Sequence, residues 1–356
     1  MKDQNPLHSL NFILREVTIQ RAKMNDLFIK ISKLLSRLNC IFVNSIKNYK
    51  MKTRIGILGL GGVGGYFGGL LAKAYKDSDK IEIIFIARGE TMENIKKSGL
   101  VIETDKDTFT AFPSVISDNP KEINRLDYLI CATKTYDIEE SLSPLQKCIN
   151  EDTMILPLYN GVDAGERIAD IFKDSEVLMG CVYIVSFIES KGKIKKVGTN
   201  EQLFFGSDVA SWKKMQKLEK ILKDAEIHAF LTDEIDNTIW MKFIFISALA
   251  STTSFLNKNI GEILTSDDHK QFFVDLVEEV AMIAAVKGID VPLDIAENML
   301  AKLAKSPQDN TSSMHRDYLK GNQTEYKSLV QKVVEEGENY EVETPNYRKV
   351  LEKINK

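Results

Sequence analysis

The chain has few cysteines, no uninterrupted apolar run long enough to span a bilayer, and no large excess of either charge. Its four cysteines lack the paired spacing of a zinc site or a disulfide framework, and they are Cys40, Cys131, Cys148 and Cys181. This usage suits a reducing compartment, so we expect a cytoplasmic protein that needs no metal. The net charge of −4 argues against a general nucleic-acid binder.

Length and composition indicate a globular protein with more than one domain. The 356 residues are 44% hydrophobic and 28% charged, as in ordinary soluble proteins. A single hydrophobic core rarely serves so long a chain. Changes in composition along the chain predict three parts, which are an N-terminal extension (1–50), an α/β domain (51–232) and an all-helical domain (233–356).

The first fifty residues differ from the rest in charge. They hold nine Lys or Arg and three Asp or Glu, a net charge of +6. Within residues 24–43 apolar positions recur at helical spacing, as in a basic amphipathic helix that lies on a membrane or on a partner. No small-residue cleavage site of a secretory signal follows. We prefer a simpler explanation, in which Met51 is the true start and residues 1–50 are a disordered tail or an annotation artefact, because the first strand of a dinucleotide-binding protein often begins within a few residues of the initiator.

A glycine-rich stretch from Arg54 to Gly69, RIGILGLGGVGGYFGG, organises the α/β part. The apolar start predicts a buried strand, and the motif after it has the G-x-G-x-x-G spacing of a dinucleotide site. A tight turn, close approach of a pyrophosphate and close packing of the next helix each need one glycine of this motif. The expected cofactor-binding residues are Gly59, Leu60, Gly61, Gly62, Val63 and Gly64. The helix that follows would present its N-terminus to the phosphates.

The surrounding pattern separates a dinucleotide site from an ordinary glycine turn. A second apolar strand over 81–87 completes a strand–helix–strand unit. It ends at Arg88, where NAD-binding proteins usually carry an acidic residue, and an arginine there accommodates the extra phosphate of NADP. The alternative is a solvated loop arginine, and the nearby Glu90 leaves the choice of cofactor open.

Two further strands end in polar residues at the edge where ligands bind in open parallel sheets. Lys134 follows a predicted strand over 127–132, and it either reaches the cofactor or is an ordinary surface lysine. Asn160 follows a strand over 153–158, and its amide either holds the nicotinamide or substrate or simply forms a turn with Gly161. Strands are also expected over 177–187 and 203–206, and a helix over 212–225.

From residue 236 the pattern becomes helical, with segments predicted over 236–257, 267–287, 291–303 and about 312–355. The first helix is apolar nearly all round, which predicts burial in the domain centre, and Lys242 interrupts it. Burial lowers the pKa of a lysine, so Lys242 is a candidate proton donor near neutral pH. The alternative is a lysine whose stem packs on apolar surface and whose ammonium reaches water.

Taken together, the ordered motifs over about 51–350 resemble the ketopantoate reductase family. They are the glycine loop, Lys134, YNGV around Asn160, IWMK around Lys242, and NTSSMHRDYLKGNQTEY near the C-terminus. The resemblance implies a Rossmann-type dinucleotide-binding domain followed by an all-helical domain, with the active site between them. It also implies NADPH-dependent reduction of ketopantoate to pantoate, on the route to pantothenate and coenzyme A, by a monomer or homodimer.

Matched residue by residue, the resemblance assigns roles within this chain. Lys242 falls on the catalytic lysine and Glu325 on an essential glutamate. Asn160 and Lys134 fall on residues at the nicotinamide end, and Arg88 on the arginine for the extra phosphate. Substrate binding is assigned to Asn160, Ser313 and Asn310, and Asp317 lies in the same motif. Lys242 would protonate the developing alkoxide, Glu325 would accept a hydrogen bond from Lys242 or from the substrate hydroxyl, and Ser313 would hold the carboxylate.

The chain departs from the family at two positions. The family usually has asparagines one and two turns after the catalytic lysine, where this chain has Ile246 and Ala250. Ser247, Ser251 and Thr252 are offset on the helix and are not simple replacements. The alternatives are therefore a reductase of another 2-keto acid, or a non-catalytic NADPH-binding regulatory homologue.

Overall fold

The computed structural model describes residues 24, 28, 30–36 and 52–354. Those before residue 37 are helical, and their side chains are exposed. Most of the predicted extension, including its possible start at Met51 and much of 24–43, lies outside the described residues. The membrane or partner role of that segment stays a prediction. Residues 53–356 form one compact unit.

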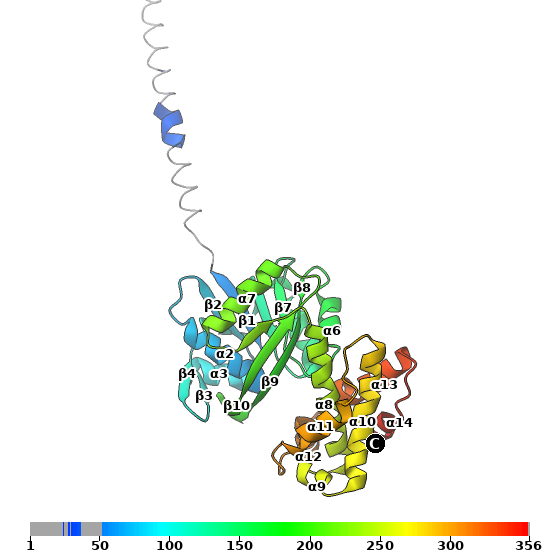
Figure 1. Cartoon of the computed structure of the whole chain (residues 1–356). Helices are drawn as coiled ribbons and strands as arrows, with labels where there is room; N and C mark the ends of the chain where they lie inside the picture. The colour runs from blue at the N-terminus through cyan, green and yellow to red at the C-terminus, as the bar shows by residue number, and fades with distance from the viewer. Residues whose placement is uncertain (1–23, 25–27, 29, 37–51, 355–356) are drawn as a thin grey trace, which may run out of the picture. The chain divides into compact units, whose positions relative to one another are not determined.

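The first half of this unit is built on a six-stranded parallel sheet (Figure 1). Its strands are β1 (Thr53–Leu58), β2 (Ile81–Ile86), β5 (Val115–Ser117), β6 (Tyr128–Cys131), β7 (Met154–Pro157) and β8 (Glu176–Val177). Their spatial order is β5-β2-β1-β6-β7-β8, with the first strand in the middle. This is the strand order of a Rossmann fold, and the change of direction between β1 and β6 creates a ligand crevice at their carboxyl ends.

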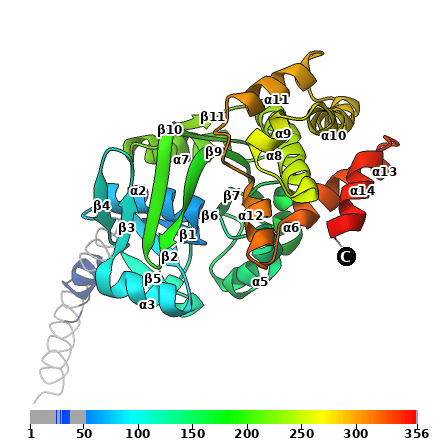
Figure 2. The same ribbon diagram turned by 90° about the horizontal axis from the view of Figure 1, so that it is seen from below.

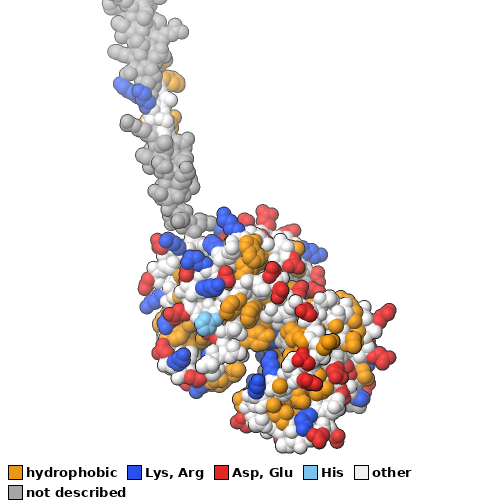
Figure 3. Space-filling view, viewed as in Figure 1, with side chains coloured by type: hydrophobic (Ala, Val, Ile, Leu, Met, Phe, Trp, Pro, Cys, Tyr) orange, Lys and Arg blue, Asp and Glu red, His pale blue; other side chains and the backbone are white. Residues whose placement is uncertain are grey.

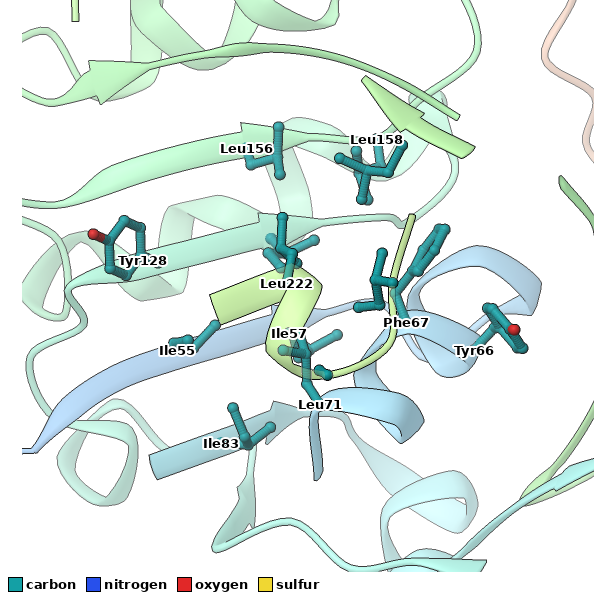
Figure 4. Close-up of a cluster of buried hydrophobic side chains, with 14 of the residues drawn as sticks. Ile55, Ile57, Tyr66, Phe67, Leu71, Ile83, Tyr128, Leu156, Leu158 and Leu222 are labelled. Carbon is teal, nitrogen blue, oxygen red and sulfur yellow. The ribbon is translucent and has the colours of Figure 1, made fainter. Parts of the chain in front are cut away.

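Helices cover both faces of the parallel sheet. They are α2 (Gly62–Ala74), α3 (Gly89–Ser98), α4 (Pro120–Ile123), α5 (Ile138–Leu142), α6 (Ala164–Ile171) and α7 (Trp212–Asp224). Ile55 and Ile57 of β1 pack with Phe67 and Leu71 of α2 and with Leu222 of α7 (Figure 4). Burial of this apolar surface fixes α2 against the sheet, and the turn between β1 and α2 is fixed with it.

A second sheet contains β3 (Leu100–Glu103), β4 (Thr108–Ala111), β9 (Met179–Ser190), β10 (Lys193–Gly206) and β11 (Ala229–Leu231). The prediction of one strand over 177–187 was wrong, because Val177 ends β8 while β9 pairs with β10 in the second sheet. β10 also begins ten residues before the predicted 203. In its first part, lysines that pair with Glu103 and Glu189 alternate with other residues. This part therefore lacks the apolar run that predicted the other strands.

The second half is helical. Its elements are α8 (Ile235–Leu256), α9 (Ile260–Leu264), α10 (Asp267–Val286), α11 (Ile295–Ala304), α12 (Ser313–Leu319), a π-helical turn (Lys327–Gln331), α13 (Lys332–Asn339) and α14 (Pro345–Ile354). Helices α10, α12 and α14 and the π-helical turn pack against α8, as seen from below in Figure 2. By length and composition α8 could cross a membrane, yet 72% of its most apolar window is buried inside the protein.

The predicted fold class is therefore confirmed. A Rossmann-type α/β region comes first and a helical region follows. The last strand, β11, ends at Leu231 and α8 begins at Ile235. The short α9 and the π-helical turn were not predicted, because five-residue elements carry little periodic signal.

Candidate active site

The glycine loop between β1 and α2 is shaped by backbone contacts that exclude side chains. Gly59 has φ +90°, and a Cβ there would lie 2.6 Å from the Thr133 amide nitrogen. A Cβ on Gly64 would collide with the carbonyl oxygen of Gly59. The loop can therefore close tightly only with glycine at both positions.

The same loop is open where a phosphate group would approach. A Cβ on Gly61 would meet nothing within 4 Å, and α2 begins at Gly62 without a side-chain cap. The first amides of the helix are thus left for an anion, which the helix dipole favours. On its other side, Gly62 lies against the backbone of Ser186 in β9. Leu60 and Val63 complete the loop, which fits a pyrophosphate.

Arg88 lies just after β2 and directly before α3. Its side chain is 72% exposed, and its guanidinium donates a hydrogen bond of 3.0 Å to the Glu140 carboxylate. Exposed ion pairs of this kind are weak. Glu90 instead pairs with Lys191. Arg88 is therefore accessible to an incoming phosphate at the edge of the sheet.

Lys134, which follows β6, bridges the two halves of the unit. Its ammonium donates to Asp317 Oδ2 at 3.0 Å and to Glu325 Oε2 at 3.2 Å. The other Glu325 oxygen accepts the Thr135 backbone N–H at 3.3 Å. Although partial burial acts to lower the pKa of Lys134, the charges and hydrogen bonds of Glu325 and Asp317 outweigh it and raise that pKa.

Glu325 is nearly fully buried, with 6% of its side chain exposed. The sequence suggested that it would face Lys242 or the substrate hydroxyl. In the structure the Glu325 carboxylate instead accepts hydrogen bonds from Lys134 and Thr135. Its negative charge acts on the pKa of Lys242 without a hydrogen bond between the two side chains. A polar pocket adjoins Glu325 and is lined by residues of both halves, among them Tyr136, Arg167 and Lys332.

Lys242 on α8 has a different environment. Its ammonium donates a hydrogen bond of 3.0 Å to Asn160 Oδ1 at the end of β7. Burial lowers its pKa; the charge of Lys302 adds to this shift, and Cys181 and Glu325 oppose it. No ion pair of Lys242 with a carboxylate occurs in residues 52–354. The structure therefore brings together Lys242 and Asn160, two residues that the sequence analysis named as candidate site residues.

A small pocket adjoins the Lys242 side chain. Its lining comes from the end of β7, from β9 and from α8, and comprises Tyr159, Gly161, Gly180, Cys181, Ile239, Lys242, Phe243 and Ile246. Such surroundings keep water from the ammonium and account for the lowered pKa. Ile246 contributes an apolar wall where the family pattern has an amide.

The hydroxyl groups that follow Lys242 on α8 are used within the helical core. Ser247 donates to the Leu329 carbonyl oxygen at 2.6 Å, and Thr252 donates to the Ala248 carbonyl oxygen at 2.8 Å. Ser251 is fully buried, as is Ala250 apart from 2% of its surface. Ser247 and Thr252 therefore stabilise the packing of the helical core.

The predicted substrate residues of the C-terminal motif lie around the start of α12. Ser313 is its first residue and is partly buried, whereas Asn310 is exposed and its carbonyl oxygen accepts the Ile260 amide. Neither side chain contacts Lys242 or Lys134 among the hydrogen bonds of the described residues. The neighbouring Ser312 caps α12 and lies 2.8 Å from the Thr253 hydroxyl.

Sequence reasoning missed Tyr183 and Lys302, which lie beside Lys242. The Lys242 Nζ is 5.8 Å from the centroid of the Tyr183 ring, and the Lys302 Nζ is 5.5 Å from it. One available signal was helical spacing, since Lys302 follows Met299 by three residues and Ile295 by seven, and both are buried. Figure 3 shows lysine or arginine side chains in the hollow between the sheet region and the helical region.

Comparison with known proteins agrees with this arrangement. Residues 55–208 match the family described as ketopantoate reductase PanE/ApbA, and residues 234–356 match its C-terminal part. The chain belongs to the ketopantoate reductase family. The family is one of oxidoreductases, and its two matched segments cover the glycine loop, Asn160, Lys242 and Glu325.

Individual members of the family and its structural neighbours resemble most of the chain. A 2-dehydropantoate 2-reductase structure from Porphyromonas gingivalis W83 is 33% identical, covers 86% of this chain and 100% of its own, and has a TM-score of 0.75. An uncharacterized oxidoreductase of Bacillus subtilis, YkpB, is 26% identical over 81% of this chain and 93% of its own length. A D-mandelate dehydrogenase structure with NADH and anilino(oxo)acetate is 23% identical, covers 84% and 96%, and has a TM-score of 0.72, a likeness of fold.

Proposed function

We propose that this protein reduces 2-dehydropantoate (ketopantoate) to pantoate with NADPH, in pantothenate and coenzyme A biosynthesis in the cytoplasm. The observation that carries the proposal is the half-buried Lys242, whose ammonium binds Asn160, lacks a carboxylate partner in residues 52–354, and has a lowered pKa. A lysine of this kind can give up a proton at moderate pH. A protein that only held a dinucleotide would not need it.

The residues of the α/β region fit the cofactor. The glycine loop from Gly59 to Gly64 would hold the pyrophosphate, because Gly61 is open and the α2 amides follow it. Arg88 would bind the extra phosphate of NADPH, since its guanidinium is exposed and has only a weak surface partner. NADPH, when bound, supplies the hydride for the carbonyl carbon. Lys134 and Asn160 would border its nicotinamide end.

Lys242 would donate its ammonium proton to the carbonyl oxygen as negative charge develops there, and the product is the 2-hydroxy acid. Asn160 orients the ammonium through the hydrogen bond at 3.0 Å. Ser313 and Asn310 would bind the substrate. Glu325 would act through Lys134, whose position it fixes. Correct placement of two reactants can lower a barrier by about 7–11 kcal/mol, so a site between two domains suits this reaction.

We place the domain boundaries at 51–232 for the NADP-binding domain and 233–356 for the catalytic domain, with residues 1–50 as an extension. The state of assembly would be a monomer or a homodimer. A dimeric ketopantoate reductase from Staphylococcus aureus is among the solved structures with this fold.

A second candidate is a reductase of another 2-keto acid. Ile246 lines the pocket beside Lys242, and Ala250 is buried, so neither supplies an amide for a polar substrate. Loss of a buried hydrogen bond to a charged group costs about 1.5–3 kcal/mol. A non-catalytic NADPH-binding regulator is the third possibility.

A panel of 2-keto acids with NADPH and with NADH tests these alternatives. Turnover of ketopantoate supports the first, turnover only of other 2-keto acids supports the second, and cofactor binding without turnover supports the third. The Arg88→Ala variant should weaken NADPH binding by roughly tenfold and leave NADH binding unchanged, because it loses a charge-assisted phosphate contact. Equal effects on both cofactors would exclude a role for Arg88 in choosing NADPH.

A further inference from the structure

A second lysine reaches the surroundings of Lys242 from a different helix. Lys302 lies on α11, and its ammonium is 4.5 Å from the centroid of the Phe245 ring and 5.5 Å from that of Tyr183. Lys242 lies over the same Tyr183 ring at 5.8 Å. Aromatic faces attract cations at these distances. The two rings therefore hold the Lys302 ammonium near the proposed proton donor.

Neither ammonium is neutralised by an ion pair within residues 52–354. Lys242 has an amide oxygen as its hydrogen-bond partner, and burial lowers the pKa of Lys302 while the buried thiol of Cys181 opposes this shift. Packing against the rings partly removes the Lys302 ammonium from water and lowers its pKa, although the residue as a whole is exposed. Two positive charges that lack a carboxylate partner and lie near the same Tyr183 ring attract an anion.

The helix that carries Lys242 offers little else to bind such an anion. Ile246 and Ala250 are apolar, and the hydroxyls of Ser247, Thr252 and Thr253 donate to backbone carbonyl oxygens. The carboxylate of a 2-keto acid is bonded directly to the ketone carbon. Its binding group must therefore lie close to the proton donor, and it must come from another element.

We propose that Lys302 binds the substrate carboxylate and thereby makes the site selective for 2-keto acids over neutral ketones. The proposal rests on the reductase function given above and gives Lys302 the carboxylate contact that the family resemblance assigns to Ser313. The carboxylate would lie between α11 and β9, with the ketone oxygen toward Lys242. Tyr183 and Phe245 would fix the Lys302 ammonium, so that less side-chain freedom is lost on binding.

The test compares Lys302→Met with Lys302→Arg and with Lys305→Met. Lys305 is the C-cap of the same helix and is exposed. The Lys305→Met substitution therefore removes an equal charge at a position away from the Tyr183 ring. Ketopantoate and its neutral amide are the two substrates. Lys302→Met should raise the KM for ketopantoate by roughly 10- to 100-fold, the usual loss for a charge-assisted contact, with a much smaller change in kcat. The KM for the amide should not change.

Lys302→Arg should retain most of the preference for the acid, and Lys305→Met should behave as the wild type. Calorimetric titration of ketopantoate into the protein gives a readout that is independent of turnover, and Lys302→Met should weaken this binding to the same extent. Unchanged KM, unchanged preference for acid over amide, or unchanged binding in Lys302→Met would overturn the proposal.

The pH profile supplies a second readout that a merely structural residue would not move. Lys242 is faced by Lys302 from α11, by Cys181 from β9 and by Glu325 from the segment before the π-helical turn. Removal of the Lys302 charge should raise the pKa of Lys242, so the alkaline limb of kcat/KM moves to higher pH in Lys302→Met. A limb that stays in place, or moves to lower pH, contradicts the proposed proximity.

The outcomes separate this proposal from the proposed function. If the wild type reduces no 2-keto acid but binds ketopantoate through Lys302, the reductase function fails and the binding site stands. If the wild type reduces ketopantoate and Lys302→Met does so with the same KM, the reductase function stands and the Lys302 site fails. If the wild type does not bind ketopantoate or any other 2-keto acid of the panel, both fail.

Discussion

Two lysines of the site region, Lys134 and Lys242, lie in opposite electrostatic environments. Lys134 pairs with Asp317 and Glu325 across the junction of the two halves, and its pKa is raised. Lys242 is half-buried beside an amide, Tyr183 and another lysine, and its pKa is lowered. The same type of side chain is thus a fixed positive charge in one place and, under the proposed function, a proton donor in the other.

This difference also separates stability from activity. A lysine whose pKa is raised by folding stabilises the protein below its unfolded pKa of about 10.4, and this contribution is lost as the pH rises through the folded value. A lysine whose pKa is lowered by folding has the opposite effect, since its charged form is penalised in the folded state. We therefore expect Lys134 to support the fold and Lys242 to reduce stability for the sake of chemistry.

The largest expected effect comes from Lys242→Met. Turnover should fall by at least ~10²-fold, the usual range for a general acid, because the alkoxide loses its proton donor. The melting temperature should not fall, since a buried charge is replaced by an apolar side chain. Steady-state assays with ketopantoate and NADPH, together with thermal melts, check both statements, with Lys305→Met as the control. Near-normal turnover would reject the role of Lys242.

For Lys134→Met we expect the effect on stability to be larger than the effect on turnover. It leaves the buried Glu325 carboxylate without its cation, so the free energy of unfolding should fall by about 1–3 kcal/mol. The exposed part of Lys134 moderates this cost, because 40% of its side chain is in solvent. Urea denaturation measures the change. A variant as stable as the wild type would show that the Lys134 pair contributes nothing to the fold.

Glu325→Gln should change the electrostatic environments of both Lys134 and Lys242. Loss of this negative charge lowers the pKa of both Lys134 and Lys242, because Glu325 raises each of them in the wild type. Since reduction needs the protonated form of Lys242, activity is lost as the pH rises through its pKa. The alkaline limb of kcat/KM should therefore move to lower pH. Limbs that coincide in variant and wild type would contradict electrostatic contact between Glu325 and Lys242.

Asp317→Asn should have the smallest effect of these variants. It tests whether Asp317, like Glu325, acts on the pKa of Lys242. The charge of Asp317 does not contribute to the pKa shift of Lys242, and 23% of the Asp317 side chain is exposed. We expect the pKa of Lys134 to fall while the pH profile of kcat/KM stays in place. Titration of Lys134 by NMR follows the first, and assays follow the second. A displaced profile would mean that Asp317, too, acts on the proton donor.

The fold could be predicted in large part because its signals are local. The glycine spacing, the apolar strands that flank it and the nearly all-apolar helix around Lys242 each follow from contacts between near neighbours in the chain. Errors fell where a local pattern was weak or shared. Val177 and the start of β9 form one apolar run but join different sheets, and the first part of β10 alternates lysines.

The site could be predicted only as a set of residues. Arg88, Asn160, Lys242 and Glu325 were named by position and by resemblance to a family, yet their partners were not. Glu325 lies 191 residues from Lys134 in the sequence and still forms its ion pair. Lys302 carried no motif, and its one signal was a helical spacing shared with the buried Ile295 and Met299.

The sequence by itself determined the dinucleotide-type turn, because glycine alone permits the backbone of Gly59 and the close contact at Gly64. It also determined that one lysine would lie within an apolar helix. Only the tertiary structure decided that Lys134 forms ion pairs and that Lys242 forms none within residues 52–354. The charge state of a lysine depends on which distant groups packing brings within a few ångströms, and neither helical periodicity nor strand periodicity encodes those distances.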